Sequence, residues 1–321
     1  MTIKTLYSSV TGGVNVISVE VTESFGQPTS RCSIVTDDYK TLSLGDSITV
    51  DLGFSDSHGK VFEGYIQDIT AEKIPGQYKI EVNDVLIRAV EYLIVSTDLE
   101  NPFSRSNISM EDLVGDLLSE AGITDYSGDA SSFTLATGEV PAEFQLVFAM
   151  DAVNQVAGII AWHCYADHNG HVYFKNIKAA PSGSAVASYT VGTSGNIVVV
   201  NRATNTDNLR NKVVVFGASP IAASAASSSA YLPAGFYKTA TISSSLIDTQ
   251  SMAETSAAYN LAAWNKLTET TKVEAIGDYA RHARQTVSVT DSFTGASGNW
   301  FIRDITHSFS TTYMIRMNLV K

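Results

Sequence analysis

His163 and Cys164 are neighbours in the sequence, and Asp167 follows three residues later. A cysteine beside a histidine base that an acid orients is an arrangement suited to nucleophilic catalysis. The surrounding residues predict a strand, however, and neighbouring side chains of a strand point to opposite faces. Because His163 and Cys164 cannot readily touch in that conformation, we interpret both as structural residues.

His163, His168 and His171 lie close together in the sequence and suggest a zinc site. Their spacing straddles a predicted turn, and neither a carboxylate nor a cysteine completes a recognisable set of ligands. Histidine in a polar hairpin is usually a solvated side chain. We therefore predict neither a metal site nor a cofactor.

Asp68 and Asp304 occupy matching positions in two similar segments and could serve as a pair of catalytic carboxylates. Equivalent positions in duplicated modules need not approach each other, so an interstrand contact or a subunit-interface bond is the favoured interpretation. No GxSxG, HExxH, P-loop or GxGxxG pattern is present. A glycosidase-type carboxylate pair has no sequence signature of its own, and that alternative stays open. We predict that the chain is not an enzyme.

Composition places the chain among ordinary globular proteins. Of its 321 residues 44% are hydrophobic and 17% charged, enough for two or three domains. No apolar run approaches the ~20 residues of a membrane span. Cys32 and Cys164 are too few for a disulfide framework and are predicted to be buried. Residues 1–130 hold 8 Lys/Arg against 21 Asp/Glu, and such acidity disfavours specific nucleic-acid binding.

The hexapeptide YIQDIT at residues 65–70 returns as FIRDIT at residues 301–306. An alternating run and a polar turn precede each copy, and another alternating run follows it, at residues 78–82 and 313–317. The pattern predicts one strand-turn-strand-turn-strand meander used twice. Two unrelated strands with a common β composition are the alternative. The residues that define the repeat, and the candidates for an interface, are Tyr65, Ile66, Asp68, Ile69, Thr70, Phe301, Ile302, Asp304, Ile305 and Thr306.

Strict alternation predicts which hexapeptide residues share a face. The first, third and fifth residues, including Tyr65 and Ile69, are expected on one face of the sheet. Ile66, Asp68 and Thr70 are expected on the other, and the second copy repeats both sets. A chain that carries one β-module twice can build a ring of doubled symmetry from half the number of subunits.

The fold class predicted is mainly β (α+β), with two β-barrel or meander modules, each packed by a helix, and an inserted α+β unit. We place the first module at residues 1–98, the inserted unit at 99–200 and the second module at 201–321, with a helix near 249–269. In the second module a capping box of Ser251 and Glu254 is predicted to begin that helix. Residues 218–230, almost all Ala and Ser, are predicted to form a mobile loop.

The inserted unit shows its own local signals. Ser109 and Asp112 resemble a capping box before a helix that stops at Gly122. A second helix is expected over residues 144–157. The Asn169-Gly170 pair between two alternating runs predicts a hairpin.

Several segments resemble the baseplate hub proteins of tailed bacteriophages, the group that includes late-control protein D and related contractile-tail hubs. They are the meander at 61–82 with the following NDVLIRAV at 83–90, NPFSR at 101–105, YLPAGFYK at 231–238 and IDTQSMA at 247–253. The resemblance covers nearly the whole chain as a diffuse pattern, without a catalytic signature.

The resemblance implies a homotrimer in which each chain supplies two tail-tube-type modules. Six modules then form a pseudo-sixfold ring that joins the tail tube, or a tube-initiator protein, to the central spike and lets DNA pass. The inserted unit would contact neighbouring baseplate proteins, and the protein would reside in the virion after assembly in the bacterial cytoplasm. Because Lys321 closely follows the second meander, spike and hydrolase domains are expected on other proteins.

Three rival functions remain from the sequence. A hexameric distal tail or tail-tip ring protein would also use β-modules. A tail-associated cell-wall hydrolase would need a carboxylate or Cys/His site in a pocket. A carbohydrate-binding module would need exposed aromatic residues, but Trp162, Trp264 and Trp300 are scattered in the sequence.

Overall fold

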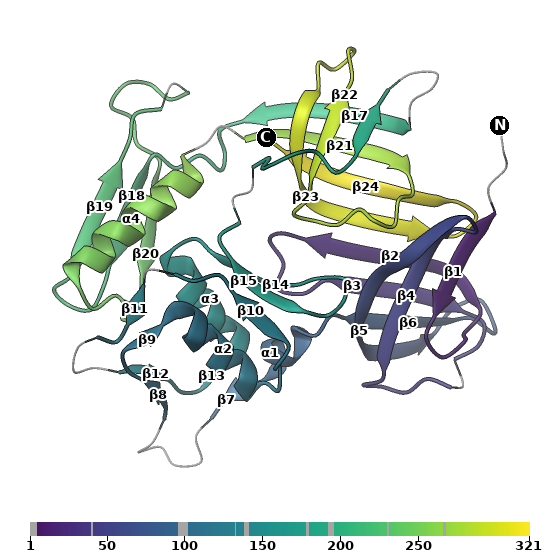
Figure 1. Cartoon of the computed structure of the whole chain (residues 1–321), viewed down its shortest axis with the longest axis horizontal. Helices are drawn as coiled ribbons and strands as arrows, with labels where there is room; N and C mark the ends of the chain where they lie inside the picture. The colour runs from purple at the N-terminus through teal and green to yellow at the C-terminus, as the bar shows by residue number, and fades with distance from the viewer. Residues whose placement is uncertain are drawn as a thin grey trace.

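The chain forms one large twisted sheet beside a region of helices and short strands (Figure 1). The computed structural model describes residues 5–39, 41–95, 102–131, 133–137, 141–177, 180–191, 196–229, 231–265 and 268–321. The domain boundary predicted near residue 98 falls outside these residues. No helix within the described ranges is long and apolar enough to cross a membrane.

The first β-module contains six antiparallel strands in the order β1-β4-β5-β6-β3-β2. Their bounds are β1 Leu6–Val10, β2 Val16–Ser24, β3 Arg31–Thr36, β4 Ser47–Phe54, β5 Ser57–Ala71 and β6 Tyr78–Asn83. Alternate residues of these strands are buried in one cluster that includes Val21, Ile34 and Ile80. This module is drawn in purple and blue in Figure 1.

The second β-module repeats this arrangement in the order β16-β22-β23-β24-β21-β17. Its bounds are β16 Ser188–Thr190, β17 Ile197–Asn205, β21 Thr268–Ile276, β22 Thr286–Thr290, β23 Ser297–Phe309 and β24 Tyr313–Val320. All neighbours are antiparallel except β16 and β22, which are parallel. A separate core lies beneath these strands and includes Trp300, Ile315 and Leu319.

The remaining described elements form a third, mixed region that contains the four helices. The helices are α1 Ile87–Glu91, α2 Met110–Glu120, α3 Ala149–Ile159 and α4 Gln250–Trp264. The strands are β7 Leu93–Ile94, β8 Phe103–Arg105, β9 Ile108–Ser109, β10 Tyr126–Gly128, β11 Thr134–Leu135, β12 Ala142–Phe144, β13 Val147–Phe148, β14 His163–Ala166, β15 Val172–Lys175, β18 Lys212–Phe216, β19 Ala222–Ala226 and β20 Thr239–Ser243. The mainly β fold with added helices that the sequence predicts is confirmed.

All four helices share one hydrophobic core, which corrects the expectation that a helix packs on each β-module. Ala89 of α1 and Ala257 of α4 belong to the same buried cluster as Leu117 of α2 and Val153 of α3. Helix α4 packs on the sheet β19-β18-β20, on the left of Figure 1, because that sheet offers it an apolar face.

Local signals decide where the helices begin. Ser109 caps α2 as predicted, and its side chain accepts a hydrogen bond from the Asp112 amide. Helix α3 begins at Ala149 and not at residue 144 as predicted, because residues 142–144 form β12 and pair with β8. Thr249 caps α4 by accepting a hydrogen bond from the Met252 amide at 3.2 Å, so the predicted capping box two residues later is wrong.

The described part of the predicted loop, residues 218–229, is also more ordered than the sequence predicts. Its residues 222–226 form β19 and pair with β18. Ala223 and Ala225 pack against the helical core, so tertiary burial overrides the weak strand propensity of alanine. The hairpin predicted at residues 167–170 is confirmed, with Asp167 and His171 hydrogen-bonded across the turn at 2.9 Å.

Candidate functional site: the seam between two repeated β-modules

The two hexapeptides occupy matching places in their sheets. Residues 65–70 lie in β5 between β4 and β6, and residues 301–306 lie in β23 between β22 and β24. In both strands the register shifts at the third residue of the hexapeptide, Gln67 in one and Arg303 in the other. A β-bulge is a specific feature of a strand pair, so its repetition supports one module used twice.

The bulges overturn the predicted distribution of side chains between the faces. An extra residue in a strand breaks the period of two. Ile66 and Ile69 therefore pack toward the same core, and Ile302 and Ile305 do so in the second module. Strict alternation had separated the members of each pair.

The strands before the hexapeptides match in conformation as well. The backbone of Ile66 exchanges hydrogen bonds with Gly45 and Asp46, and the backbone of Ile302 does so with Arg284 and Gln285. Gly45 has a φ of 84° and Arg284 a φ of 75°. The left-handed region disfavours a side chain. The side chain present at Arg284 places its guanidinium 3.9 Å from the centre of the Tyr165 ring.

A second pair of bulges relates β2 to β17. The register of β2 against β3 shifts between Val16 and Ser18. That of β17 against β21 shifts between Ile197 and Val199. The two modules thus share two irregularities at equivalent places, which makes β2 the structural counterpart of β17. The first module has a third shift, between Val50 and Asp51 of β4, that β22 does not repeat.

The modules join where β2 pairs with β23 in antiparallel register. The Ser24 hydroxyl donates to Asp304 at 2.5 Å, and the Thr22 and Thr306 hydroxyls lie 3.3 Å apart. The Phe25 ring meets the Phe301 ring edge-on, with centroids 5.5 Å apart. Three predicted interface residues of the second copy therefore lie at the seam within the chain.

Their counterparts in the first copy lie elsewhere. The Arg88 guanidinium lies 4.3 Å from the centre of the Tyr65 ring. Asp68 and Thr70 are exposed and hydrogen-bond to each other at 2.5 Å. Strands β6, β3 and β2 separate Asp68 from Asp304, so these two do not form a facing carboxylate pair.

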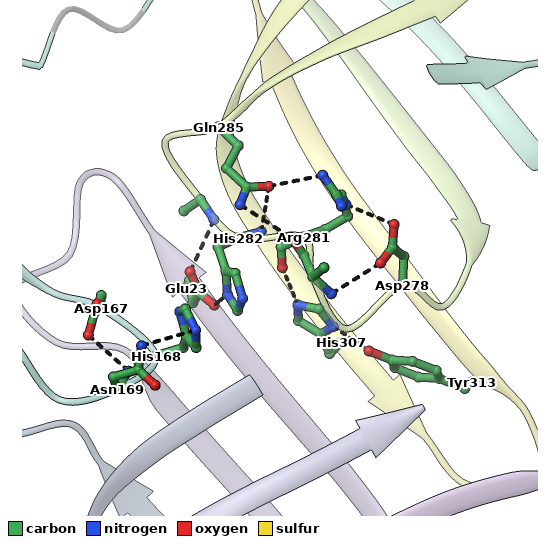
Figure 2. Close-up of polar contacts among 12 residues, drawn as sticks. Glu23, Asp167, His168, Asn169, Asp278, Arg281, His282, Gln285, His307 and Tyr313 are labelled. Atoms are coloured by element: carbon green, nitrogen blue, oxygen red, sulfur yellow. Dashed lines mark hydrogen bonds and ion pairs between the residues drawn. The ribbon is translucent and has the colours of Figure 1, made fainter. Parts of the chain in front are cut away.

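A buried polar network lies on the core side of the seam (Figure 2). Glu23, at the end of β2, accepts a hydrogen bond from His282 Nδ1 at 2.7 Å and another from the Ala283 amide at 3.0 Å. His307 of β23 donates from Nε2 to the Arg281 carbonyl at 2.9 Å, and its Nδ1 accepts from the Tyr313 hydroxyl at 2.8 Å. The network ties the first module to the loop before β22.

The charge states within the network follow from burial and pairing. Burial alone would raise the pKa of Glu23, but the hydrogen bond and charge of His282 outweigh it and hold that pKa below its usual value. Burial lowers the pKa of His307 to about 4, so this imidazole is neutral at pH 7. Glu23 is therefore a carboxylate paired mainly with His282.

A metal is a poor fit for this cluster, although its ligand atoms from Glu23, His282 and His307 lie within 4.8 Å of one another. Each ligand needs a free lone pair directed at the metal. His307 Nε2 uses its proton for a carbonyl, and Glu23 is occupied by His282 and a backbone amide. The donor set suits a structural brace.

The three histidines considered for zinc have separate surroundings. His163 packs on Phe25 with ring centroids 4.0 Å apart. His168 stacks on His282 at 4.0 Å, as Figure 2 shows, while His171 contacts Asp125 at 2.6 Å. His168 therefore joins the hairpin of the mixed region to the seam, a contact with no local signal in the sequence.

The predicted structural role of Cys164 agrees with its surroundings. His163 is half-buried and Cys164 is buried, in keeping with the alternating pattern of β14. Burial raises the pKa of the Cys164 thiol to about 12, which keeps it protonated. A neutral thiol is a weak nucleophile.

Comparison with solved structures finds proteins of similar fold. No family model matches the sequence, and no curated protein matches it either. The tail protein from Neisseria meningitidis MC58 is similar with a TM-score of 0.72 and 15% identity, covering 99% of this chain and 97% of that one. The 43 kDa tail protein of prophage MuSo2 from Shewanella oneidensis has a TM-score of 0.69 and 15% identity, covering 98% and 97%.

A third similar structure is the E. coli c3393 protein, with a TM-score of 0.57 and 10% identity, covering 98% of this chain and 76% of that one. It is described as a component of the type VI secretion system that is structurally similar to the T4 bacteriophage tail proteins gp27 and gp5. This chain therefore shares, over almost its whole length, the fold seen in two proteins described as tail proteins.

Proposed function

We propose that this chain is a structural protein of a phage tail, a trimeric baseplate hub that joins the tail tube to the central spike. The observation that carries the proposal is the internal duplication, with two six-stranded modules that share strand order and both bulges. Three chains supply six modules, which gives a ring that can meet a sixfold tube on one side and a threefold spike on the other.

Similarity of fold supports a tail role, because two matching structures are described as tail proteins. The third match is described as similar to proteins of the T4 tail. From these descriptions we infer a virion location, reached by assembly in the host cytoplasm. The partners proposed are the tail tube or a tube-initiator protein, the spike and neighbouring baseplate proteins, the last contacted by the mixed region that contains α2 and α3.

The polar face of the large sheet is proposed to line the pore through which DNA passes. Paired residues continue this face across both modules, opposite the two cores, and its members include Glu20, Thr22, Arg31, Ser33, Asp68, Lys79, Glu81, Asn201, Lys272, Glu274, Asp304, Thr306, Arg316 and Asn318. Charges on this face are mixed in both modules: Arg31 and Lys79 stand among the acidic residues of the first module, and Lys79 forms an ion pair with Glu81. A pore lined by this face offers the DNA phosphate backbone little continuous positive surface to bind.

A non-enzymatic role is part of the proposal. The candidate thiol is buried and protonated, and the two repeated aspartates lie on strands that three others separate. A zymogram on peptidoglycan tests this role directly. Lysis by the purified chain would support the hydrolase alternative.

Native mass spectrometry of the full chain co-expressed with its spike and tube partners tests the stoichiometry. The proposal predicts three copies of this chain for each spike trimer. Six copies would contradict the hub and support a distal tail ring protein. A single copy for each spike would contradict both rings.

A further inference from the structure

We propose that the outer edge of β17 in one copy pairs with the C-terminal half of β5 in the next, repeating between chains the seam that β2 and β23 form within a chain. The partner is a second copy of this chain. This inference rests on the proposed ring and specifies which edges of the chain meet.

The register of the seam within the chain fixes the register between chains. Val19 of β2 and Val200 of β17 both sit opposite equivalent core positions, Ile34 in β3 and Val273 in β21. Thr22 follows Val19 by three residues, as Ala203 follows Val200, and Thr306 and Thr70 are the last residues of the two hexapeptides. The intrachain pair Thr22–Thr306 therefore corresponds to the interchain pair Ala203–Thr70. The four expected pairs are Arg202–Ala71, Ala203–Thr70, Thr204–Ile69 and Asn205–Asp68.

Both edges are available within the described part of the chain. Strand β17 ends the sheet and pairs only with β21. Residues 68–71 of β5 pair with β6 on one side, and β4 pairs only with the earlier part of the strand. An unpaired edge presents N–H and C=O groups that attract another strand, so two such edges with matching counterparts point to a docking site.

Exposure differs between the closed seam and the open edges. Glu23 and His307 are 6% and 0% exposed at the seam. Their counterparts Thr204 and Ala71 are exposed in the single chain. Docking of a second copy would bury Thr204 and Ala71, just as the seam within the chain buries Glu23 and His307.

The expected side-chain pairs are compatible. Asn205 meets Asp68, and Ala203 meets Thr70, on the polar face, so no like charges stand directly opposite each other. Thr204 meets Ile69 on the core face, where β-branched side chains pack well in a sheet. Because the two edges differ, each contact runs head to tail, and such contacts form a ring when the rotation closes.

Cysteine cross-linking of the full chain tests the register. Directly opposite residues of an antiparallel pair lie about 4.5–5.5 Å apart at Cα, within disulfide range. The variant Ala203→Cys with Thr70→Cys, oxidised at high protein concentration, is expected to give covalent oligomers that end at a closed three-chain species without free engineered thiols. Native Cys32 and Cys164 are buried and should not interfere.

Two matched controls accompany this variant. Thr22→Cys with Thr306→Cys places the same pair at the intrachain seam and should close within one chain, which verifies oxidation. Ala203→Cys with Ala71→Cys shifts one cysteine by one residue, to the opposite face of the strand, and should give at most one tenth of the covalent oligomer.

The outcomes separate this inference from the proposed function. If the seam control oxidises and the Ala203/Thr70 pair yields no more oligomer than the shifted pair, the edge pairing is wrong. The native stoichiometry then decides the ring independently. Specific cross-links that continue to six chains would support the pairing and contradict the trimer.

Discussion

The two β-modules share a backbone plan and differ in whether another strand pairs with the end of the hexapeptide strand. In the second module, β23 pairs with β2 of the first module; Glu23 and His307 are buried beneath this seam, and His282 is half-buried. In the first module the equivalent stretch of β5 is exposed. One chain therefore shows equivalent strand stretches paired in one module and open in the other, and the buried polar residues Glu23 and His307 lie where the stretch is paired.

Removing the seam carboxylate should have the largest effect. Glu23→Ala leaves His282 and the Ala283 amide without their acceptor, and loss of one partner from a buried pair costs about 3–5 kcal/mol of unfolding free energy. Urea unfolding of the full chain measures this cost. The matched change Thr204→Ala, at the open edge, should cost under about 0.5 kcal/mol, and equal costs would contradict the comparison.

The hexapeptide cores should respond alike. Ile66 is 1% exposed and Ile302 is 0% exposed, so Ile66→Ala and Ile302→Ala should each lower the unfolding free energy by about 2–4 kcal/mol. Thermal and urea unfolding of the two variants provide the measurement. A cost below about 1 kcal/mol at either position would show that the two hexapeptides do not contribute equally to the unfolding free energy.

The seam histidine should make stability depend on pH. Burial lowers the pKa of His307 to about 4, whereas an unfolded histidine titrates near 6.5. As the pH falls below about 6.5 the unfolded state takes up the proton first, so this group's contribution is lost progressively toward pH 4. His307→Gln should flatten the stability curve between pH 6 and 5 by up to about 1.4 kcal/mol per pH unit.

The difference between variant and parent is the relevant measurement, because other groups act in both proteins. Burial raises the pKa of Asp84 to about 7, which destabilises the fold as the pH rises and opposes the histidine. His58→Gln, at an exposed position, serves as the control. An unchanged slope in His307→Gln would contradict a neutral imidazole at the seam.

The smallest effect is expected at the matched left-handed positions. A Cβ on Gly45 would meet no neighbouring atom within 4 Å, so Gly45→Ala isolates the cost of its φ of 84°, about 1–2 kcal/mol. Gly26→Ala, also in open space but without a positive φ, is the control. Equal unfolding free energies for the two variants would remove the conformational argument at Gly45.

The sequence predicts the repeat because the hexapeptides preserve their residue types. It does not locate the bulges at Gln67 and Arg303, because Tyr65 and Ile69 also fit a strict alternation, and the spacing of three between Ile66 and Ile69 does not say which residue is the extra one. The match of β2 with β17 is hidden as well, because Glu23 is replaced by Thr204 where the edge is open. The hexapeptides keep the same residue types because both pack against a core in the same way. Strands β2 and β17 have different neighbours at their outer edges, so their residues differ.

The candidate site was only half predictable for a physical reason. Asp304 and Thr306 lie in the repeat, whereas Glu23 bonds to His282 across 259 positions of sequence. No local spacing encodes such a contact. A carboxylate near the end of an apolar alternating strand was the one available signal, and Glu23 carries it.

Cryo-electron microscopy of assembled tails tests the central claim most directly, because it shows how many β-modules surround the axis. The account predicts three copies of this chain, whose six modules occupy equivalent places around one pore with β2–β23 and β17–β5 joints in alternation. Six copies, or three copies whose first and second modules occupy unrelated positions, would contradict it.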